Sequence, residues 1–319
     1  MLETSLTDQL SLEVPIVGAP MAGVAGGALA AAVSAGGGLG MIGVGSADPA
    51  ELIRTEAAIA RGTGHRYGVG LMAWALRDRP DQFDAAVEAE PALVSVSFGA
   101  YRPWVERLLD AGIPVATQVG DTDEARAAAD AGVDFVVARG SEAGGHGRDR
   151  VATLPLLQSI LDAIDVPVLA AGGIATGRGL AAVLAAGASG AWIGTALLAS
   201  PEAINPVPAR ARAIAATETD TVATSVFDLA QHIDWPPNYP GRALANQFFR
   251  EWSGREGELA ASPEATAQLA EARRSGDYER AFVYAGQGVG LLDAELPAAA
   301  VVSSMASEAR RLLDRWRAT

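Results

Sequence analysis

The 319-residue sequence contains no cysteine. This absence excludes disulfide bonds, thiolate nucleophiles, cysteine-ligated metals and iron–sulfur clusters. Basic residues are scarce as well, with 24 lysines and arginines against 38 aspartates and glutamates, and the formal net charge is −14. Such an acidic chain repels nucleic acid and anionic membranes, so we expect neither as a partner. An anionic ligand would have to be held by local donors.

The sequence also lacks a leader pattern and an unbroken apolar run. Residues 1–12 mix acidic and polar side chains without a basic segment followed by an apolar one, so we expect no signal peptide. The apolar stretch 24–44 is interrupted by seven glycines. A buried helix and strand explain this stretch better than a membrane span does. We therefore expect a cytoplasmic protein.

What the sequence does contain is a repeated unit of a short apolar segment, a loop and an alanine-rich helical stretch. The predicted strands are residues 14–18, 40–44, 67–71, 93–97, 114–119, 135–138, 166–170 and 191–193. The predicted helices are residues 26–35, 49–61, 81–89, 102–111, 122–131, 154–164 and 177–186. Nearly continuous apolar strands are typical of a parallel sheet that is covered on its outer face.

This repeated unit predicts an α/β fold, and eight units fit a closed (β/α)₈ TIM barrel. A doubly wound sheet accepts the same number of units. It would carry a dinucleotide fingerprint after its first strand, but residues 18–23 lack the GxGxxG spacing. We therefore predict a barrel built from residues 1–200 and 281–319.

The repeat stops after the eighth predicted strand. Residues 201–280 are rich in proline and aromatic residues and show no strand alternation. We interpret them as a mainly helical insertion that forms a lid over the barrel mouth. The chain then returns to a last helix with one apolar stripe, which we expect to dock on the outside of the barrel. The stripe consists of Val302, Met305, Ala309, Leu312 and Trp316.

Two strand ends carry the strongest chemical signal. The seventh predicted strand ends in Gly172 and Gly173, and the eighth ends in Gly194 and Thr195. In a barrel these two loops lie side by side at the C-terminal rim, where their backbone N–H groups form a nest for an anion. Glycine permits the close approach of a phosphate, and the Thr195 hydroxyl adds a donor. A single glycine pair would more often be a tight turn, but two at these strands favour a phosphate site.

The loop after the sixth strand, residues 138–148, places four glycines around His146. It leaves the C-terminal rim, where barrel enzymes keep their chemistry. The glycines allow the backbone to fold against a flat ligand, and imidazole suits proton transfer near neutral pH. We therefore select His146 as the catalytic candidate. His65 and His232 are interpreted as structural, and no metal site is expected.

Several of these segments together resemble the nitronate monooxygenase family, formerly called 2-nitropropane dioxygenases. The matching segments span most of the chain and are residues 18–22, 140–146, 171–174, 192–195 and 284–290. The resemblance implies an FMN-containing barrel with a lid-like insertion and makes His146 the catalytic histidine.

The resemblance also implies which residues contact the flavin. Pro20, Met21 and Ala22 would lie along the isoalloxazine ring. The residues expected to hold the ribityl phosphate are Gly144, Gly172, Gly173, Gly194 and Thr195. Further cofactor candidates from the same motifs are Gly145, Trp192, Ile193 and Gln287.

Two positions depart from the family pattern. Arg139 stands where the family often has glutamine, and Gly70 stands where it often has asparagine. We keep both as candidate flavin contacts. Gln118, at the end of the fifth predicted strand, is the candidate for a substitute polar contact.

The resemblance implies oxidation of alkyl nitronates by FMN and O₂ to a carbonyl compound and nitrite. Neutral nitroalkanes would require His146 to remove the α-proton. The alternative is an NAD(P)H-dependent reductase of an α,β-unsaturated acyl thioester, because related FMN enzymes share a similar glycine–histidine loop. A flavin-binding protein without turnover is a third hypothesis, against which the glycine-framed His146 argues. All three have a small-molecule partner, and each is compatible with a homodimer.

Overall fold

Eight parallel strands form the barrel that the sequence predicts. The computed structural model describes residues 2–317, and the side chains of residues 2–315. The strands follow one another around the sheet in the order β1–β9–β8–β6–β5–β4–β3–β2. Their bounds are β1 (Ile16–Gly18), β2 (Gly40–Gly43), β3 (Tyr67–Met72), β4 (Leu93–Ser97), β5 (Val115–Val119), β6 (Phe135–Arg139), β8 (Val168–Ala171) and β9 (Gly190–Ile193). Every predicted strand is present, with ends that differ from the prediction by two residues at most.

The sheet closes between β1 and β2. The Gly18 N–H donates to the carbonyl of Leu39 over 2.9 Å, and the Leu39 N–H donates to the carbonyl of Ile16 over 3.0 Å. These bonds join β1 to the residue that precedes β2. The doubly wound alternative is thereby excluded, because such a sheet remains open.

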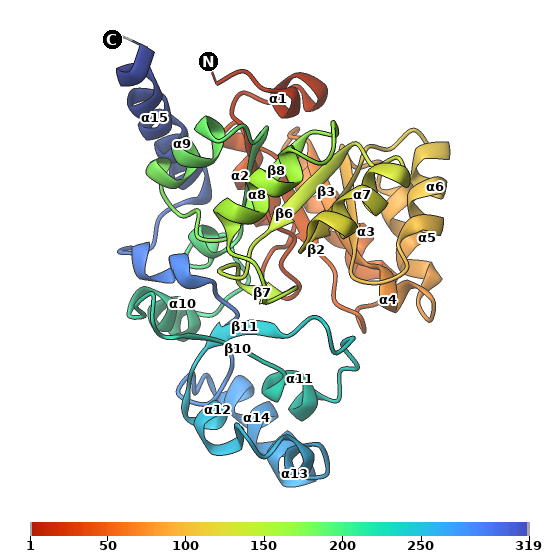
Figure 1. Cartoon of the computed structure of the whole chain (residues 1–319). Coiled ribbons are helices and arrows are strands. Elements are labelled where there is room, and N and C mark those ends of the chain that lie inside the picture. Colours follow the sequence, from red (N-terminus) through yellow and green to blue (C-terminus); the bar gives the residue numbers. More distant parts are fainter. Residues whose placement is uncertain (1, 318–319) are drawn as a thin grey trace.

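Helices between the strands cover the outside of the barrel (Figure 1). The predicted ones are α2 (Gly27–Ala35), α3 (Ala50–Gly62), α5 (Pro80–Glu88), α6 (Arg102–Asp110), α7 (Thr122–Asp130), α8 (Thr153–Leu161) and α9 (Gly177–Ala185). One extra turn, α4 (Ala73–Leu76), follows β3. Asp121 caps α7 by accepting a hydrogen bond from the Glu124 N–H over 2.9 Å.

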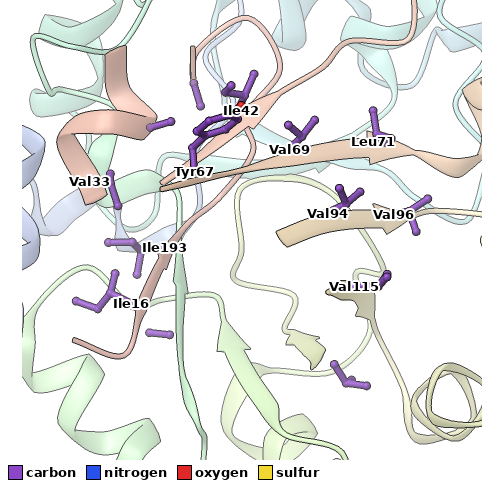
Figure 2. Packing of buried hydrophobic residues seen from close by; sticks show 14 of the residues in the cluster. Ile16, Val33, Ile42, Tyr67, Val69, Leu71, Val94, Val96, Val115 and Ile193 are labelled. Carbon is purple, nitrogen blue, oxygen red and sulfur yellow. The ribbon is translucent and has the colours of Figure 1, made fainter. Parts of the chain in front are cut away.

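Successive strand residues point to opposite faces and divide the core into two layers. Ile42, Val69 and Val94 lie side by side on neighbouring strands and face the helices, as Figure 2 shows. The opposite layer fills the barrel interior with residues such as Phe135 and Leu169. This arrangement explains why the strands are apolar on both faces.

A short N-terminal helix that the sequence analysis did not assign, α1 (Ser5–Leu10), packs into the bottom of the barrel. Thr4 and Thr7 form a reciprocal capping box at its start. Leu6 and Leu10 are fully buried in the interior layer. With six residues, this helix is too short to show a periodic pattern, and its stability comes from these two buried leucines.

The last helix, α15 (Ala298–Arg317), packs against α9 and α2 on the outside of the barrel. Val302, Met305 and Ala309 are buried, and Leu312 packs against the same core cluster. The predicted docking of the apolar stripe is confirmed for these four residues. The side chain of Trp316 lies outside the described residues.

Residues 201–280 form a separate lobe at the end of the barrel opposite α1 (Figure 1). Its helices are α10 (Val207–Ile214), α11 (Val226–Gln231), α12 (Gln247–Trp252), α13 (Glu256–Ala260) and α14 (Pro263–Ser275). The prediction of a mainly helical insertion is correct, but the expectation of no strands in it is wrong. Two four-residue strands, β10 (Thr221–Thr224) and β11 (Gly241–Leu244), pair with each other. They are too short to show an alternating pattern.

Candidate active site

The histidine loop is part of a small sheet that joins the barrel to the insertion. Its residues Gly145–His146 form β7, which pairs antiparallel with β11. His146 lies opposite Gly241, and Gly145 lies opposite Arg242. A Cβ on Gly241 would approach the Nε2 atom of His146 to 3.0 Å. Glycine at this position therefore leaves room for the imidazole.

His146 contacts a buried carboxylate from the insertion. Its Nε2 atom lies 3.0 Å from both carboxylate oxygens of Asp228, which belongs to α11. The Tyr284 hydroxyl donates to Oδ1 of the same carboxylate over 2.8 Å. The side chains of His146 and Asp228 are 10% and 5% exposed. Water therefore has little access to this pair, and their electrostatic interaction is stronger than it would be at the surface.

Tyr284 remains a hydrogen-bond donor over the physiological pH range. Burial raises the pKa of its hydroxyl well above the usual value, and the adjacent Asp228 carboxylate raises it further. A neutral tyrosine beside an ionised carboxylate can only donate to it. Asp228 thus accepts hydrogen bonds from two side chains that lie far apart in the sequence.

Aromatic side chains cover the imidazole. The ring of Trp235 stacks on His146 with a centroid distance of 3.7 Å and an interplanar angle of 6°. Trp235 also contacts Trp74 and Phe98, which follow barrel strands, at centroid distances of 5.2 and 5.3 Å. Tyr239 contacts Phe98 at 5.4 Å. The insertion therefore supplies an aromatic cover for the barrel mouth next to His146.

Arg139 holds the glycine loop from inside. Its side chain is buried, and its Nη2 atom donates to the carbonyls of Ala143, Gly144 and Gly145 over 3.1, 2.9 and 2.8 Å. Burial lowers the pKa of Arg139 to about 10, and the positive charge of Arg242 adds to this shift. The guanidinium is still charged at neutral pH. Whether Arg139 also contacts the flavin stays a prediction.

Glu142 fixes the other side of the same loop. Its Oε2 atom accepts hydrogen bonds from the backbone N–H and the hydroxyl of Thr153, over 2.8 and 2.7 Å. Thr153 is the first residue of α8, so the carboxylate also lies at the positive end of a helix. The loop that carries His146 is therefore anchored from two sides.

The two glycine strand ends lie at the same rim. Gly172 and Gly173 have φ angles of +120° and +69°, a backbone conformation that favours glycine. A Cβ on Gly173 would point into open space. Thr195 begins the turn η1 (Thr195–Leu197), and its hydroxyl accepts a hydrogen bond from the Gly286 N–H over 2.9 Å.

A hollow of about 270 Å³ adjoins this rim. It is lined by Gly173, the exposed Gln287 and the carboxylates Glu142 and Glu218, together with Gly288, Gly290 and Leu291. Gln287 belongs to the turn η2 (Gln287–Leu291). Glycine leaves the space beside the Gly173 backbone free for a ligand, and we call this space the glycine cradle.

The other predicted cofactor residues lie around the barrel mouth. Met21 is adjacent to Gly194, since a Cβ on Gly194 would meet its sulfur at 3.3 Å. A Cβ on Gly70 would overlap the ring of Pro20. Pro20 thus occupies the space that a side chain at position 70 would need. Ala22 is exposed at the rim.

Four of the cofactor candidates differ in how they face the mouth. Gln118 and Arg139 line a small hollow at the ends of β5 and β6. Trp192 is buried in the interior layer of the barrel. Ile193 packs into the outer layer, so its side chain points away from the barrel interior. Ile193 can therefore face a ligand only through its backbone.

In the described part of the chain, neither of the two other histidines has a side-chain hydrogen bond or ring contact with His146. His65 is exposed in the loop before β3. His232 ends α11, and its Nε2 atom lies 3.1 Å from the hydroxyl of Thr266. Sequence reasoning missed Asp228, Trp235 and Tyr284 as members of the site, although Tyr284 begins one of the segments that carry the family resemblance. An acidic residue within the apolar segment Val226–Leu229 was the available signal for Asp228, and nothing comparable marks Trp235.

Over most of its length, the chain is similar to members of one known protein family. A family model described as nitronate monooxygenase matches residues 79–308. A probable nitronate monooxygenase from Staphylococcus aureus is 30% identical over 97% of this chain and 98% of its own length. The chain belongs to the nitronate monooxygenase family.

Solved structures agree with this membership. Nitroalkane oxidase from Streptomyces ansochromogenes is 34% identical, covers 97% of this chain and 99% of its own, and has a TM-score of 0.80. FabK from Thermotoga maritima is 31% identical, covers 100% and 99%, and has a TM-score of 0.87. As a member of this family, the protein is a flavin-dependent oxidoreductase on a TIM barrel. No helix within residues 2–317 is both long enough and apolar enough to cross a membrane.

Proposed function

We propose that this protein uses FMN and O₂ to oxidise alkyl nitronates to a carbonyl compound and nitrite. The observation that carries the proposal is the placement of His146, held by Asp228 at the barrel mouth on the same rim as the glycine cradle. Family membership supports the flavin and the reaction class. FMN is favoured over a dinucleotide because the sequence offers one phosphate nest and no pyrophosphate fingerprint.

Bound flavin would supply the electron chemistry of the reaction. Its phosphate would be held by the backbone of Gly172, Gly173 and Gly194 and by Thr195. The remaining residues proposed to line it are Pro20, Met21, Ala22, Gly70, Gln118, Arg139, Gly144, Gly145, Trp192, Ile193 and Gln287. Pro20 and Arg139 suit this role because they lie at the mouth and are fixed by packing or by hydrogen bonds.

His146 would hold the substrate. Its Nε2 atom is engaged by Asp228, which leaves Nδ1 for the ligand. When protonated, Nδ1 can donate a hydrogen bond to a nitronate oxygen, and the carboxylate behind the ring compensates the positive charge. The aromatic side chains around Trp235 would exclude water from this contact.

One relative favours a second candidate function. A Rhodococcus jostii protein named as an octahydro-indene carboxyl-CoA dehydrogenase is 35% identical over 72% of this chain and 65% of its own length. Its name indicates an acyl-CoA substrate, so a reductase of an unsaturated acyl thioester is the alternative. Nitronate oxidation remains the leading proposal, because the matching family model and a relative that covers nearly the whole chain carry the name nitronate monooxygenase.

Anaerobic flavin reduction distinguishes the two functions. The purified holoenzyme is mixed with ethyl nitronate or with NADPH in the absence of O₂, and flavin absorbance is followed by stopped flow. We expect rapid bleaching with the nitronate and none with NADPH. Bleaching by NADPH that is reversed by an enoyl-CoA, without any reaction of the nitronate, would contradict the proposal.

A further inference from the structure

Asp228 is a buried carboxylate with an unusual set of partners. Within the described residues, its ion-pair-length contact is with His146, and no arginine lies within that distance. Its other hydrogen-bond partner is the neutral hydroxyl of Tyr284. Burying a carboxylate without a permanent cation costs folding free energy unless another group pairs with it or donates hydrogen bonds to it. The group that could supply a compensating positive charge is His146.

We propose that Asp228 is a positioning residue that fixes the proton of His146 on Nε2 and so makes Nδ1 a base for neutral nitroalkanes. This inference rests on the proposed function and concerns those substrates that must lose an α-proton, the neutral nitroalkanes. Asp228 itself touches no substrate. It acts through the orientation and charge of the imidazole.

The geometry dictates the position of the proton. An ionised carboxylate only accepts hydrogen bonds, so the Nε2 atom facing it must carry a hydrogen. The second nitrogen, Nδ1, has no hydrogen-bond partner among the side chains and backbone that the structure describes. In neutral imidazole this nitrogen therefore presents a lone pair.

The surrounding residues prevent the ring from exchanging its two nitrogens. Trp235 covers one face of the imidazole at 3.7 Å. Tyr284 contacts the ring at a centroid distance of 5.1 Å and also holds the carboxylate in place. Gly241 pairs with His146 across the small sheet, and a Cβ on Gly241 would approach Nε2 to 3.0 Å. A flip of the ring would require several of these contacts to break at once.

The proton transfer is balanced within this set of groups. The α C–H bond of the nitroalkane breaks, the proton forms an N–H bond with Nδ1, and the electron pair stays on the substrate as nitronate. The resulting imidazolium lies between the Asp228 carboxylate and the nitronate, and its new Nδ1–H can donate to a nitronate oxygen. Nothing is oxidised or reduced in this step.

A purely structural role for Asp228 would have different consequences. The carboxylate also ties α11 of the insertion to the barrel loop, and losing that tie would weaken turnover of every substrate alike. A role in setting the proton position affects only substrates that must lose a proton. The ratio between a nitroalkane and its own nitronate separates the two roles.

The test is Asp228→Asn in the holoenzyme, assayed with nitroethane and with ethyl nitronate. The amide can donate to Nε2 and so favours the opposite tautomer. We expect kcat for nitroethane to fall about 10²–10⁴-fold, the usual contribution of general-base catalysis, and kcat for the nitronate to fall about tenfold at most. Asp234→Asn, an exposed position of the same insertion, is the matched control and should leave both rates unchanged.

A second measurement is independent of activity. Proton–nitrogen correlation spectra of protein labelled at its three histidines report which nitrogen of His146 carries the hydrogen. We expect the Nε2–H form in the unmodified protein and its loss in Asp228→Asn. Tyr284→Phe removes the other hydrogen bond to Asp228 but keeps the carboxylate, so it should retain the Nε2–H form. This comparison separates loss of the carboxylate from loss of a contact in the same cluster.

The outcomes distinguish this inference from the proposed function. Equal losses on the two substrates, a wild-type enzyme that oxidises ethyl nitronate but not nitroethane, or an Nδ1–H form in the unmodified protein would each overturn the role of Asp228. If neither nitro compound is consumed, the proposed function fails, and the tautomer measurement still decides whether Asp228 sets the proton position.

Discussion

At the scale of single residues, the site is assembled from side chains that the sequence keeps far apart. His146 comes from a barrel loop, Asp228 and Trp235 come from the insertion, and Tyr284 comes from the returning segment. Each depends on the others for its chemical state, because the carboxylate holds a proton on the imidazole and the tyrosine holds the carboxylate. Substitutions at these positions should therefore change chemistry more than flavin content.

Replacing His146 with asparagine should leave flavin binding intact, since the glycine cradle lies on other loops. Turnover of a neutral nitroalkane should fall about 10²–10⁴-fold, because the base is lost. Turnover of the matching nitronate should fall less, because an amide still donates a hydrogen bond. Steady-state kinetics on both substrates check this. Equal losses would give His146 a binding role instead of a basic one.

Gly173→Val should weaken FMN binding at least tenfold, about 1.4 kcal/mol. The φ of +69° strains any side chain, and the added Cβ enters the open cradle. Fluorescence titration with FMN measures the effect. Gly64→Val is the matched control, because Gly64 has a φ of +78° and open space at its Cβ but lies before β3 at the other end of the barrel.

Gly194→Val should also weaken FMN binding, for a different reason. Its φ of −118° suits valine, but the added side chain would press on Met21 and Ala19 at the barrel mouth. We expect this variant to shift the absorbance spectrum of the bound flavin. Normal FMN affinity in both glycine variants would place the phosphate elsewhere.

The raised pKa of Tyr284 predicts that the stability of the folded protein depends on pH. Because its pKa in the folded protein lies above the ordinary value of 10.0, its contribution to stability is complete below that pH and is lost as the pH rises toward the folded-state pKa. The free energy of unfolding of the unmodified protein should fall by about 1.4 kcal/mol per pH unit in this range, and Tyr284→Phe should lack this slope. Urea unfolding of both proteins between about pH 8 and 11 measures the difference. Parallel pH profiles would contradict the prediction.

At the scale of elements, short segments gain their structure from their neighbours. The strand β7 exists because β11 pairs with it, and α1 exists because Leu6 and Leu10 fill the bottom of the barrel. Neither segment is long enough to be stable by itself. The histidine loop is therefore ordered by contacts with the insertion as well as by its own glycines.

The packing of the short helix α1 into the barrel predicts that truncating its buried side chains lowers the stability of the protein. Leu6 is fully buried in the interior layer of the barrel. Leu6→Ala should lower the free energy of unfolding by about 2–5 kcal/mol, as expected for a leucine truncated in a packed core. Gln9→Ala, on the exposed face of the same helix, is the control and should change it little. Chemical denaturation distinguishes the two, and equal effects would show that α1 does not pack as described.

At the scale of the whole molecule, the barrel and the insertion share one site. The barrel supplies His146 and the glycine cradle, and the insertion supplies the Asp228 carboxylate and the aromatic cover. A ligand bound between them should stabilise both parts together, because binding to the folded state alone shifts the unfolding equilibrium.

The purified protein should release FMN, and not FAD, on denaturation. At an FMN concentration of about 100 Kd, binding stabilises the folded state by about 2.7 kcal/mol. For a chain of this size that corresponds to a rise in Tm of about 4 °C. Thermal unfolding with and without FMN measures the rise, and chromatography identifies the released flavin. Stoichiometric FAD, or an unchanged Tm after reconstitution, would contradict the single phosphate nest.

The sequence by itself determined the barrel and its rim. Most strands of the barrel are nearly continuous apolar segments, and the positive φ angles of Gly172 and Gly173 favour glycine locally, so both features leave a pattern that is visible in short windows. His146 was visible for the same reason, because its loop has four glycines within residues 138–148. The contact between β1 and Leu39 closes the barrel, and its prediction required no sequence pattern other than the eight strands.

Only the tertiary structure decided what surrounds the histidine. Asp228 and Tyr284 are 82 and 138 residues from His146 in sequence, and no local pattern encodes contacts over such separations. The same holds for Arg139, whose position suggested a flavin contact and whose guanidinium is engaged by the carbonyls of its own loop. Local sequence records which backbone conformations and faces are favoured, whereas burial and pairing of charges depend on which segments folding brings together.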